Sequence, residues 1–231
     1  MTIGIIGAME EEIKNILNDM NVLTTKTAIG LDFYLGTLPE SSTSIVLVRS
    51  GIGKVNAALC AQTLIDLFAV DAIINTGVAG AMADGMKVGD IAISTEAMYH
   101  DFDTSALGDE PGYISRMDTS IFAADVKLME VAEEAVKEIG YPVFKGRVVS
   151  GDQFISGAEI KAQIKSMYNP VCCEMEGAAI AHTCHLNKIP FVIIRAISDN
   201  ADDEGDINYE AFFRESAVAA ARIIKNMIAK I

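Results

Sequence analysis

The chain opens on Thr2-Ile3-Gly4-Ile5-Ile6-Gly7-Ala8-Met9-Glu10-Glu11-Glu12, an apolar run that turns into three acidic residues. An unbroken run of Ile and Gly indicates a strand that is buried on both faces. Acidic residues are favourable in the first turn of a helix, because they offset the positive end of its dipole. The stretch therefore predicts a buried strand followed at once by a helix, and the dipole accounts for one or two of the three glutamates without any chemistry.

Apolar strands alternate with amphipathic helices along the rest of the chain. We expect strands near Thr2–Ala8, Leu31–Thr37, Ser44–Ser50, Asp71–Gly77, Asp90–Tyr99, Phe144–Gly151, Val171–Glu174 and Phe191–Ser198. We expect helices near Glu10–Met20, Lys54–Phe68, Ser120–Ile139, Glu159–Met167, Gly177–Leu186 and Tyr209–Lys230. This alternation predicts an α/β fold with a largely parallel sheet covered on both faces. A hairpin of Leu31–Thr37 with Ser44–Arg49 would make the sheet mixed, and no linker divides residues 1–231, so we expect a single domain.

Charge and hydropathy restrict the partners that the protein can have. The 231 residues carry a net charge of −14, which argues against nucleic acid or an anionic membrane as the main partner. No run approaches the roughly 20 apolar residues of a membrane span. The apolar start is too short for a signal peptide and lacks a basic flank, so a cytoplasmic location is expected. The 4 cysteines fit this location as buried, reduced thiols.

Two carboxylates lie one residue apart in the stretch Val171-Cys172-Cys173-Glu174-Met175-Glu176-Gly177-Ala178-Ala179-Ile180-Ala181. On a strand, residues i and i+2 point to the same face, so Glu174 and Glu176 would project together. Burying an ionised carboxylate without partners is costly, and proteins seldom do so for stability. Two interpretations remain open. The stretch is a strand end at the solvent edge, or it is a site for a polyol or a cation at the mouth of the sheet.

A further acidic residue follows the apolar run Phe191-Val192-Ile193-Ile194-Arg195-Ala196-Ile197, which ends in Ser198-Asp199. In α/β folds, functional groups gather just beyond the carboxyl ends of the strands. Glu12, the pair at 174 and 176, and Asp199 each lie at or close to such an end. Their agreement predicts one shared acidic site.

Two glycine-containing stretches resemble nucleotide motifs only in part. Ser50-Gly51-Ile52-Gly53-Lys54 is no Walker loop, because Val48 and Val55 occupy positions that need Gly and Ser or Thr. It also fails as a dinucleotide motif, since Asn56 replaces the third glycine. What remains is a glycine turn before a helix, whose free backbone N–H groups can hold a hydroxyl or an anion. We expect a second turn at residues 77–81, where a flat ligand could approach the backbone closely.

No metal site and no cofactor are expected. His182 and His185 lie i, i+3 on a predicted helix, but no second Cys/His pair has zinc spacing, so histidines on a helix surface are the simpler account. The least regular stretch, His100 to Asp118, is a long loop of the kind that carries function or covers an interface.

Several motifs, taken in order, resemble those of the bacterial 5′-methylthioadenosine/S-adenosylhomocysteine nucleosidases. They are Ile3–Glu12, Ser50–Val55, Asn75–Gly80, Gly151–Ile155, Glu174–Glu176 and Arg195–Asp199. The resemblance runs from the first residues to the final helix. It implies the nucleoside phosphorylase-like fold, a three-layer α/β/α sandwich with a central mixed sheet, assembled as a homodimer. It also implies hydrolysis of the N-glycosidic bond of both named nucleosides in methionine salvage, with 5′-deoxyadenosine as a further candidate substrate.

The resemblance also assigns roles to residues. Glu12 would be the base that activates water, and Asp199 the acid that protonates adenine N7. Glu176 and Met175 would hold the ribose hydroxyls, supported by Glu174 and Arg195. Further residues would contact the nucleoside: Phe154 stacked on adenine, Ile155 and Ser198 at its edge, Tyr209 over the base, and Met9, Ile52, Val78, Ala79 and Gly80 along the ribose and thioether. Leu107 of the partner subunit would close the 5′ pocket. Val78 departs from the family, since many members have Ser there.

The chemistry supports this assignment, and two alternatives remain. Cleavage of an N-glycosidic bond builds positive charge on the ribose and negative charge on the base, so it needs an acid, a base and anionic groups near the sugar. A phosphorylase of the same fold would need basic groups for phosphate, and relatives of that type carry Arg where this chain has Asn75. A non-catalytic nucleoside-binding protein would not need Glu12 and Asp199. The preferred 5′ substituent stays open between methylthio, homocysteinyl, 5′-deoxy and the aminodeoxyfutalosine tail.

Overall fold

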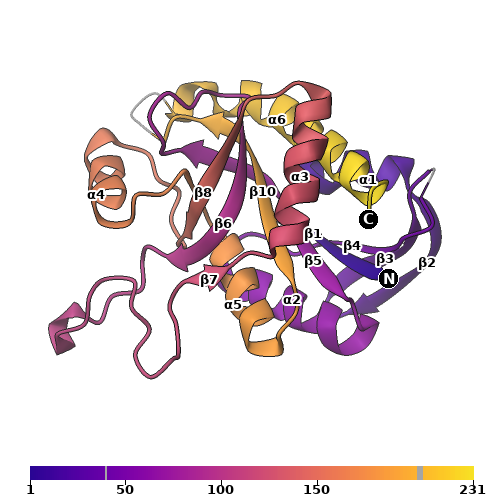
Figure 1. Cartoon of the computed structure of the whole chain (residues 1–231), viewed down its shortest axis with the longest axis horizontal. Helices are drawn as coiled ribbons and strands as arrows, with labels where there is room; N and C mark the ends of the chain where they lie inside the picture. The colour runs from indigo at the N-terminus through magenta and orange to yellow at the C-terminus, as the bar shows by residue number, and fades with distance from the viewer. Residues whose placement is uncertain (40, 202–204) are drawn as a thin grey trace.

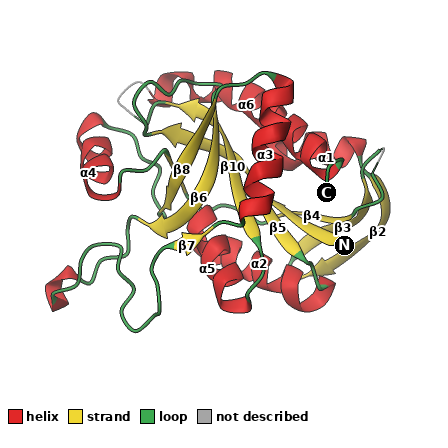
Figure 2. Cartoon of the chain, in the orientation of Figure 1, coloured by secondary structure: helices red, strands yellow, loops and turns green. Residues whose placement is uncertain are grey.

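A mixed sheet forms the middle of the molecule (Figures 1 and 2). The computed structural model describes residues 1–39, 41–201 and 205–231, without the side chains of residues 205–211. The strands in this part of the chain are β1 (Thr2–Gly7), β2 (Asn21–Ala28), β3 (Leu31–Thr37), β4 (Ser44–Arg49), β5 (Ala72–Ala81), β6 (Ile91–Tyr99), β7 (Phe122–Ala123), β8 (Val143–Ser150), β9 (Cys172–Glu174) and β10 (Phe191–Asp199). The helices are α1 (Glu10–Asp19), α2 (Lys54–Phe68), α3 (Val126–Ile139), α4 (Ala158–Tyr168), α5 (Gly177–Asn187) and α6 (Gly205–Ile228).

The sheet follows the order β10-β6-β8-β9-β5-β1-β4-β3-β2, and β10 also pairs with β5. The second pairing closes five strands, β10, β6, β8, β9 and β5, into a ring, whereas β1, β4, β3 and β2 extend from it as an open sheet. Both parallel and antiparallel pairs occur: β1 is parallel to β4 and β5, and β3 is antiparallel to β4. The predicted hairpin of β3 and β4 and the predicted mixed sheet are therefore confirmed.

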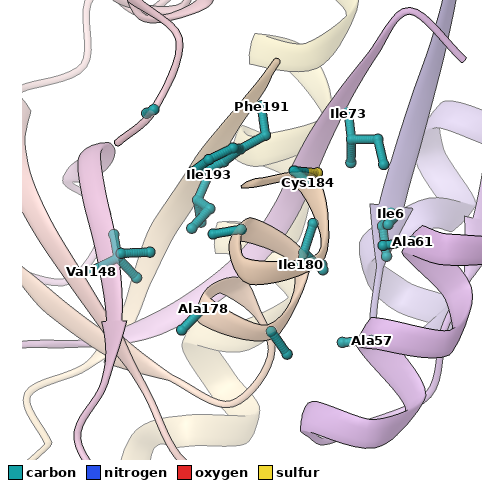
Figure 3. Packing of buried hydrophobic residues seen from close by; sticks show 14 of the residues in the cluster. Ile6, Ala57, Ala61, Ile73, Val148, Ala178, Ile180, Cys184, Phe191 and Ile193 are labelled. Atoms are coloured by element: carbon teal, nitrogen blue, oxygen red, sulfur yellow. The ribbon is translucent and has the colours of Figure 1, made fainter. Parts of the chain in front are cut away.

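Helices bury both faces of the sheet, as the unbroken apolar strands predicted. On one face, Ile5 and Ile74 belong to a core shared with α1, α3 and α6. On the other face, Ile6 and Ile73 belong to a core shared with α2 and α5, which Figure 3 shows in part. Successive residues of one strand thus enter different cores, which is why the strands lack a polar face. No helix in the described part of the chain has the length and apolar character to cross a bilayer.

The structure differs from the prediction at several elements; β7, for example, occupies Phe122–Ala123 within the expected helix. The strand β2 was not predicted, because it has no buried face and even its apolar residues Val22 and Leu23 are exposed; its pairing with β3 is what holds this edge strand. The helix α3 begins at Val126 and not at Ser120, because the Asp125 side chain accepts the Leu128 N–H and caps it there. The turn expected at residues 77–81 is strand, since β5 continues to Ala81 and pairs with β9 and β10.

Candidate active site

A cavity of about 550 Å³ lies where β5, β9 and β10 end beside the start of α1. The predicted site residues that line it are Met9, Glu12, Ile52, Val78, Ala79, Gly80, Phe154, Ile155, Glu174, Met175, Glu176, Ser198 and Asp199. Ala8, Gln153 and Cys173 also line it and were not among the predicted residues. Cys173 could have been found, because its neighbour Cys172 enters the core and adjacent strand residues face opposite ways. The cavity therefore gathers the acidic groups that the sequence placed at separate strand ends.

Glu12, in the first turn of α1, is held by three backbone N–H groups from outside that helix. Its Oε2 accepts hydrogen bonds from the N–H of Ala8 at 2.7 Å and of Met9 at 3.0 Å, and its Oε1 accepts one from Val78 at 3.1 Å. Burial raises the pKa of the Glu12 carboxyl, and the charge of Arg195 and these N–H groups oppose that rise without cancelling it. A fixed, buried carboxylate with a raised pKa is suited to take a proton from water near neutral pH.

Gly77 on β5 leaves the space that Glu12 occupies. A Cβ at this position would lie 2.5 Å from Glu12 Oε1 and 3.3 Å from Arg195 Nη1. Real Cβ atoms do not approach other atoms so closely. The lack of a side chain at residue 77 is therefore a condition for this carboxylate position.

Glu174 forms a buried ion pair with Arg195 behind the cavity. Arg195 Nη2 lies 2.5 Å from Glu174 Oε2 and donates to Asn75 Oδ1 at 2.6 Å. Glu174 also accepts hydrogen bonds from Ser150 Oγ and from the N–H of Gly177. Burial alone would raise the pKa of the Glu174 carboxyl, but Arg195 and these donors outweigh it and hold the pKa below its ordinary value. Glu174 is thus an ionised, fully engaged group, and Arg195 supports the site without lining the cavity.

Glu176 does not continue the strand of Glu174, which corrects the predicted geometry. The strand β9 ends at Glu174, and Glu176 is the N-cap residue of α5. Glu174 turns back to accept the N–H of Glu176, while Glu176 Oε1 accepts the N–H of Gly53 at 2.8 Å. Burial, and then the charge of Glu174, raise the pKa of Glu176 to about 8. Both residues are buried, so the interpretation as a solvent-exposed strand end is wrong.

Asp199 ends β10 next to a register shift between Ile197 and Asp199. Its Oδ1 accepts the N–H of Ala201 at 2.8 Å, and its Oδ2 accepts the Ser198 hydroxyl at 2.9 Å. A Cβ on Gly80 would lie 2.9 Å from Oδ1, so the glycine at residue 80 makes room for this carboxyl. Asp199 and Glu12 therefore reach one cavity from β10 and α1.

Phe154 and Ile155 lie at the cavity, whereas Leu107 does not line it. Phe154, with 51% of its surface exposed, and the buried Ile155 line the cavity from the segment after β8. Leu107 is 83% exposed in the segment between β6 and β7, which extends away from the sheet in Figure 1. Tyr209 falls outside the residues whose side chains the structure describes.

The two candidate histidines have packing roles. His182 stacks on Phe122 with ring centroids 4.7 Å apart, and its Nδ1 lies 3.2 Å from the Tyr99 hydroxyl. His185 Nε2 lies 3.1 Å from Asp118 Oδ1. Within the described residues, no three His, Cys, Asp or Glu side chains form a group that could hold a metal ion.

Known proteins match the sequence of this chain over almost its full length. The family model described as "Phosphorylase superfamily" matches residues 2–229. The chain belongs to this superfamily. A 5′-methylthioadenosine/S-adenosylhomocysteine nucleosidase of Halalkalibacterium halodurans is 42% identical over 230 residues, which cover 99% of this chain and 98% of that protein. Within the superfamily, the chain is therefore a member of the 5′-methylthioadenosine/S-adenosylhomocysteine nucleosidase family.

Solved structures confirm the fold. The nucleosidase of the same name from Neisseria meningitidis, in complex with methylthio-immucillin-A, has a TM-score of 0.95 and 40% identity, and the match covers 100% of this chain and 99% of that one. A futalosine hydrolase of Helicobacter pylori has a TM-score of 0.94 and 32% identity over 100% of this chain and 98% of that one. The α/β nucleoside phosphorylase-like fold with a mixed sheet and the predicted family are confirmed. Nucleosidases that differ in their named substrates share this backbone.

Proposed function

We propose that this nucleosidase hydrolyses the N-glycosidic bond of 5′-methylthioadenosine and S-adenosylhomocysteine, releasing adenine and the 5′-substituted ribose. One observation carries the proposal: Glu12, Glu176 and Asp199 line a single cavity from three different elements. An N-glycosyl hydrolase needs a base for water, an acid for the leaving purine and an anion near the sugar. The cavity supplies one carboxyl group for each task.

Glu12 activates the attacking water in this proposal. Its raised pKa lets it accept a proton near neutral pH, and three backbone N–H groups keep it aimed into the cavity. Asp199 donates a proton to N7 of the departing adenine. This division of labour between two carboxyl groups is that of an inverting glycosidase, applied to a nitrogen leaving group.

Glu176 binds the ribose hydroxyls together with Met175. As the bond to adenine breaks, positive charge develops on the sugar, and a carboxylate beside it stabilises the transition state more than the ground state. Glu174 and Arg195 act indirectly, because Glu174 accepts the N–H of Glu176 and of Gly177 and so shapes the turn that presents Glu176.

Water, and not phosphate, is the nucleophile. None of the described lining residues is Lys or Arg. The nearby Arg195 donates hydrogen bonds to Glu174 and Asn75, so its charge is already paired inside the protein. Asn75 donates to the Ile6 carbonyl, and its amide carries no charge that could bind phosphate. The negative charge of an ionised Glu12 would also repel a phosphate dianion in the cavity. We expect the rate of adenine release to be indifferent to added phosphate; a ribose 1-phosphate product would reassign the protein to the phosphorylases.

The test separates the two catalytic residues. Glu12→Gln keeps the shape but cannot accept the proton of water, so kcat should fall by at least about 100-fold while the nucleoside still binds. Asp199→Asn should slow methylthioadenosine severely and should slow much less a nitrophenyl thioriboside, whose leaving group needs no proton. Equal losses on both substrates would remove Asp199 from the acid role. Wild-type activity of Glu12→Gln would refute the mechanism.

We further propose that the chain works as one domain and as a cytoplasmic homodimer. The segment between β6 and β7 carries apolar side chains outward, Leu107 at 83% and Tyr113 at 44% exposure, with no core of their own. A partner cavity that receives Leu107 would account for this exposure. Light scattering at assay concentration should give twice the chain mass, and Leu107→Asp should raise KM for methylthioadenosine. A fully active monomer would refute this assembly.

A comparison of kcat/KM for four substrates would identify the preferred 5′ substituent of the substrate. Methylthioadenosine, S-adenosylhomocysteine, 5′-deoxyadenosine and aminodeoxyfutalosine share the adenine and ribose that the carboxyl groups address, so we expect all four to bind. We propose the first two as the preferred pair. A higher kcat/KM for aminodeoxyfutalosine would place the chain with the hydrolases of that nucleoside.

A further inference from the structure

An ion cluster outside the cavity joins Lys54 to two aspartates. Lys54 Nζ lies 2.7 Å from Asp101 Oδ1 and 2.5 Å from Asp101 Oδ2, and 3.7 Å from Asp152 Oδ2. The ammonium group also lies 5.3 Å from the centroid of the Tyr99 ring. We call Lys54, Asp101 and Asp152 the clasp. None of its three residues lines the cavity.

Backbone hydrogen bonds tighten the clasp. Asp152 Oδ1 accepts the N–H of Lys54 at 2.8 Å, and Asp101 Oδ2 accepts the N–H of Asp152 at 2.9 Å. The N-cap residue of α2 is Gly53, which has no side chain to cap the helix. A carboxylate 98 residues further along the chain therefore takes that role. The clasp fixes backbone positions as well as side chains.

Each member of the clasp belongs to a segment that shapes the site. Lys54 follows Gly53, whose N–H holds Glu176 at 2.8 Å. Asp152 precedes Gln153, Phe154 and Ile155, which line the cavity on the predicted purine side. Asp101 stands at the start of the segment between β6 and β7, which carries Leu107. Three segments distant in sequence thus converge on one ammonium group.

We propose that Lys54 is a positioning residue, which through Asp101 and Asp152 sets the separation between the ribose turn at residues 50–53 and the purine segment at residues 153–155. This inference rests on the proposed function. The proposed base lies on α1 and the proposed acid on β10, and none of the clasp's hydrogen bonds and ion pairs named above involves either element. Loss of the clasp therefore weakens nucleoside binding and leaves the chemical step nearly intact.

The test uses three substitutions at two lysines. Lys54→Met keeps the length of the side chain but removes its charge, and Lys54→Arg restores the charge. Lys145→Met removes an ion pair with Glu133 that does not involve the clasp or the cavity lining. For methylthioadenosine we expect Lys54→Met to raise KM by about tenfold or more, with kcat within about threefold of wild type. Lys54→Arg should recover most of the affinity, and Lys145→Met should match wild type.

A double-mutant cycle with Asp101→Asn checks the mechanism of the effect. If the two residues act as one unit, the KM of the double variant equals that of Lys54→Met, whereas independent effects multiply. An unchanged KM in Lys54→Met overturns the inference, as does a fall in kcat and melting temperature at constant KM, which is the pattern of a purely structural residue. These outcomes are read only against an active wild type; absence of adenine release by wild type would instead refute the proposed function.

Discussion

Replacement of Glu176 by Gln should stabilise the folded protein at alkaline pH, although it removes a proposed ligand of the substrate. The pKa of this carboxyl rises from an ordinary value of 4.5 to about 8 in the folded chain. Between these values the folded state holds a proton that the unfolded state has lost, so stability falls as pH rises through this window. Each pKa unit corresponds to about 1.4 kcal/mol, so the interval corresponds to about 5 kcal/mol.

The assay is urea unfolding of wild type and Glu176→Gln at pH 5, 7 and 9. The amide keeps an oxygen for the N–H of Gly53, so the comparison isolates the charge. We expect near-equal stability at pH 5, a gain of about 3 kcal/mol for the variant at pH 7 and about 5 kcal/mol at pH 9. Glu11→Gln, on the exposed side of α1, is the control and should show no such trend. A difference that does not change with pH would refute the reasoning.

Two further substitutions test the packing of the site. Gly77→Ala places a methyl group 2.5 Å from Glu12 Oε1, so the carboxylate must move. We expect kcat to fall by about tenfold or more while the circular dichroism spectrum stays unchanged. Full activity would show that the proposed base does not need this position. Ser150→Ala removes a hydroxyl that donates to Glu174 and accepts the N–H of Ala178 at 2.7 Å. Urea unfolding should show that the free energy of unfolding falls by about 1–3 kcal/mol. An unchanged midpoint would mean that water replaces the hydroxyl.

Local patterns predicted the elements of this fold well. Strands such as β1 and β10 are apolar runs that are buried along almost their whole length, and each has a paired strand on both sides, so their sequence pattern alone identifies them. The prediction failed where tertiary contacts decide. The strand β2 has no buried face, and its hydrogen bonds to β3 define it, which periodicity cannot show. The strand β5 runs through two glycines that looked like a turn, because neighbours on both sides pair with it.

The residue types of the candidate site, and their position at the ends of strands, were predictable from the sequence. The hydrogen-bond partners of each side chain were not. Acidic residues after apolar strands identified Glu12 and Asp199, since few other reasons exist to place carboxyl groups there. Which donor holds which carboxylate depends on contacts such as Gly53 to Glu176, 123 residues apart. The clasp could not be predicted from the sequence for the same reason. Its residues look like ordinary surface charges until the fold brings residues 54, 101 and 152 together.

The charges of the site lead to a final prediction about protons. Arg195 balances Glu174, whereas burial raises the pKa of Glu176 to about 8, so Glu176 holds a proton in the free protein near neutral pH. A ligand with a positive sugar ring favours the ionised carboxylates and should expel about one proton per site near pH 7.5, whereas a neutral carbocyclic analogue should expel much less. Calorimetry in two buffers of different ionisation enthalpy measures this release. Glu176→Gln should abolish most of it, because the amide has no proton to lose in this range. Equal heats in both buffers for the cationic ligand would show that the carboxyl groups are already ionised, and the site would then attract the transition state by standing charge alone.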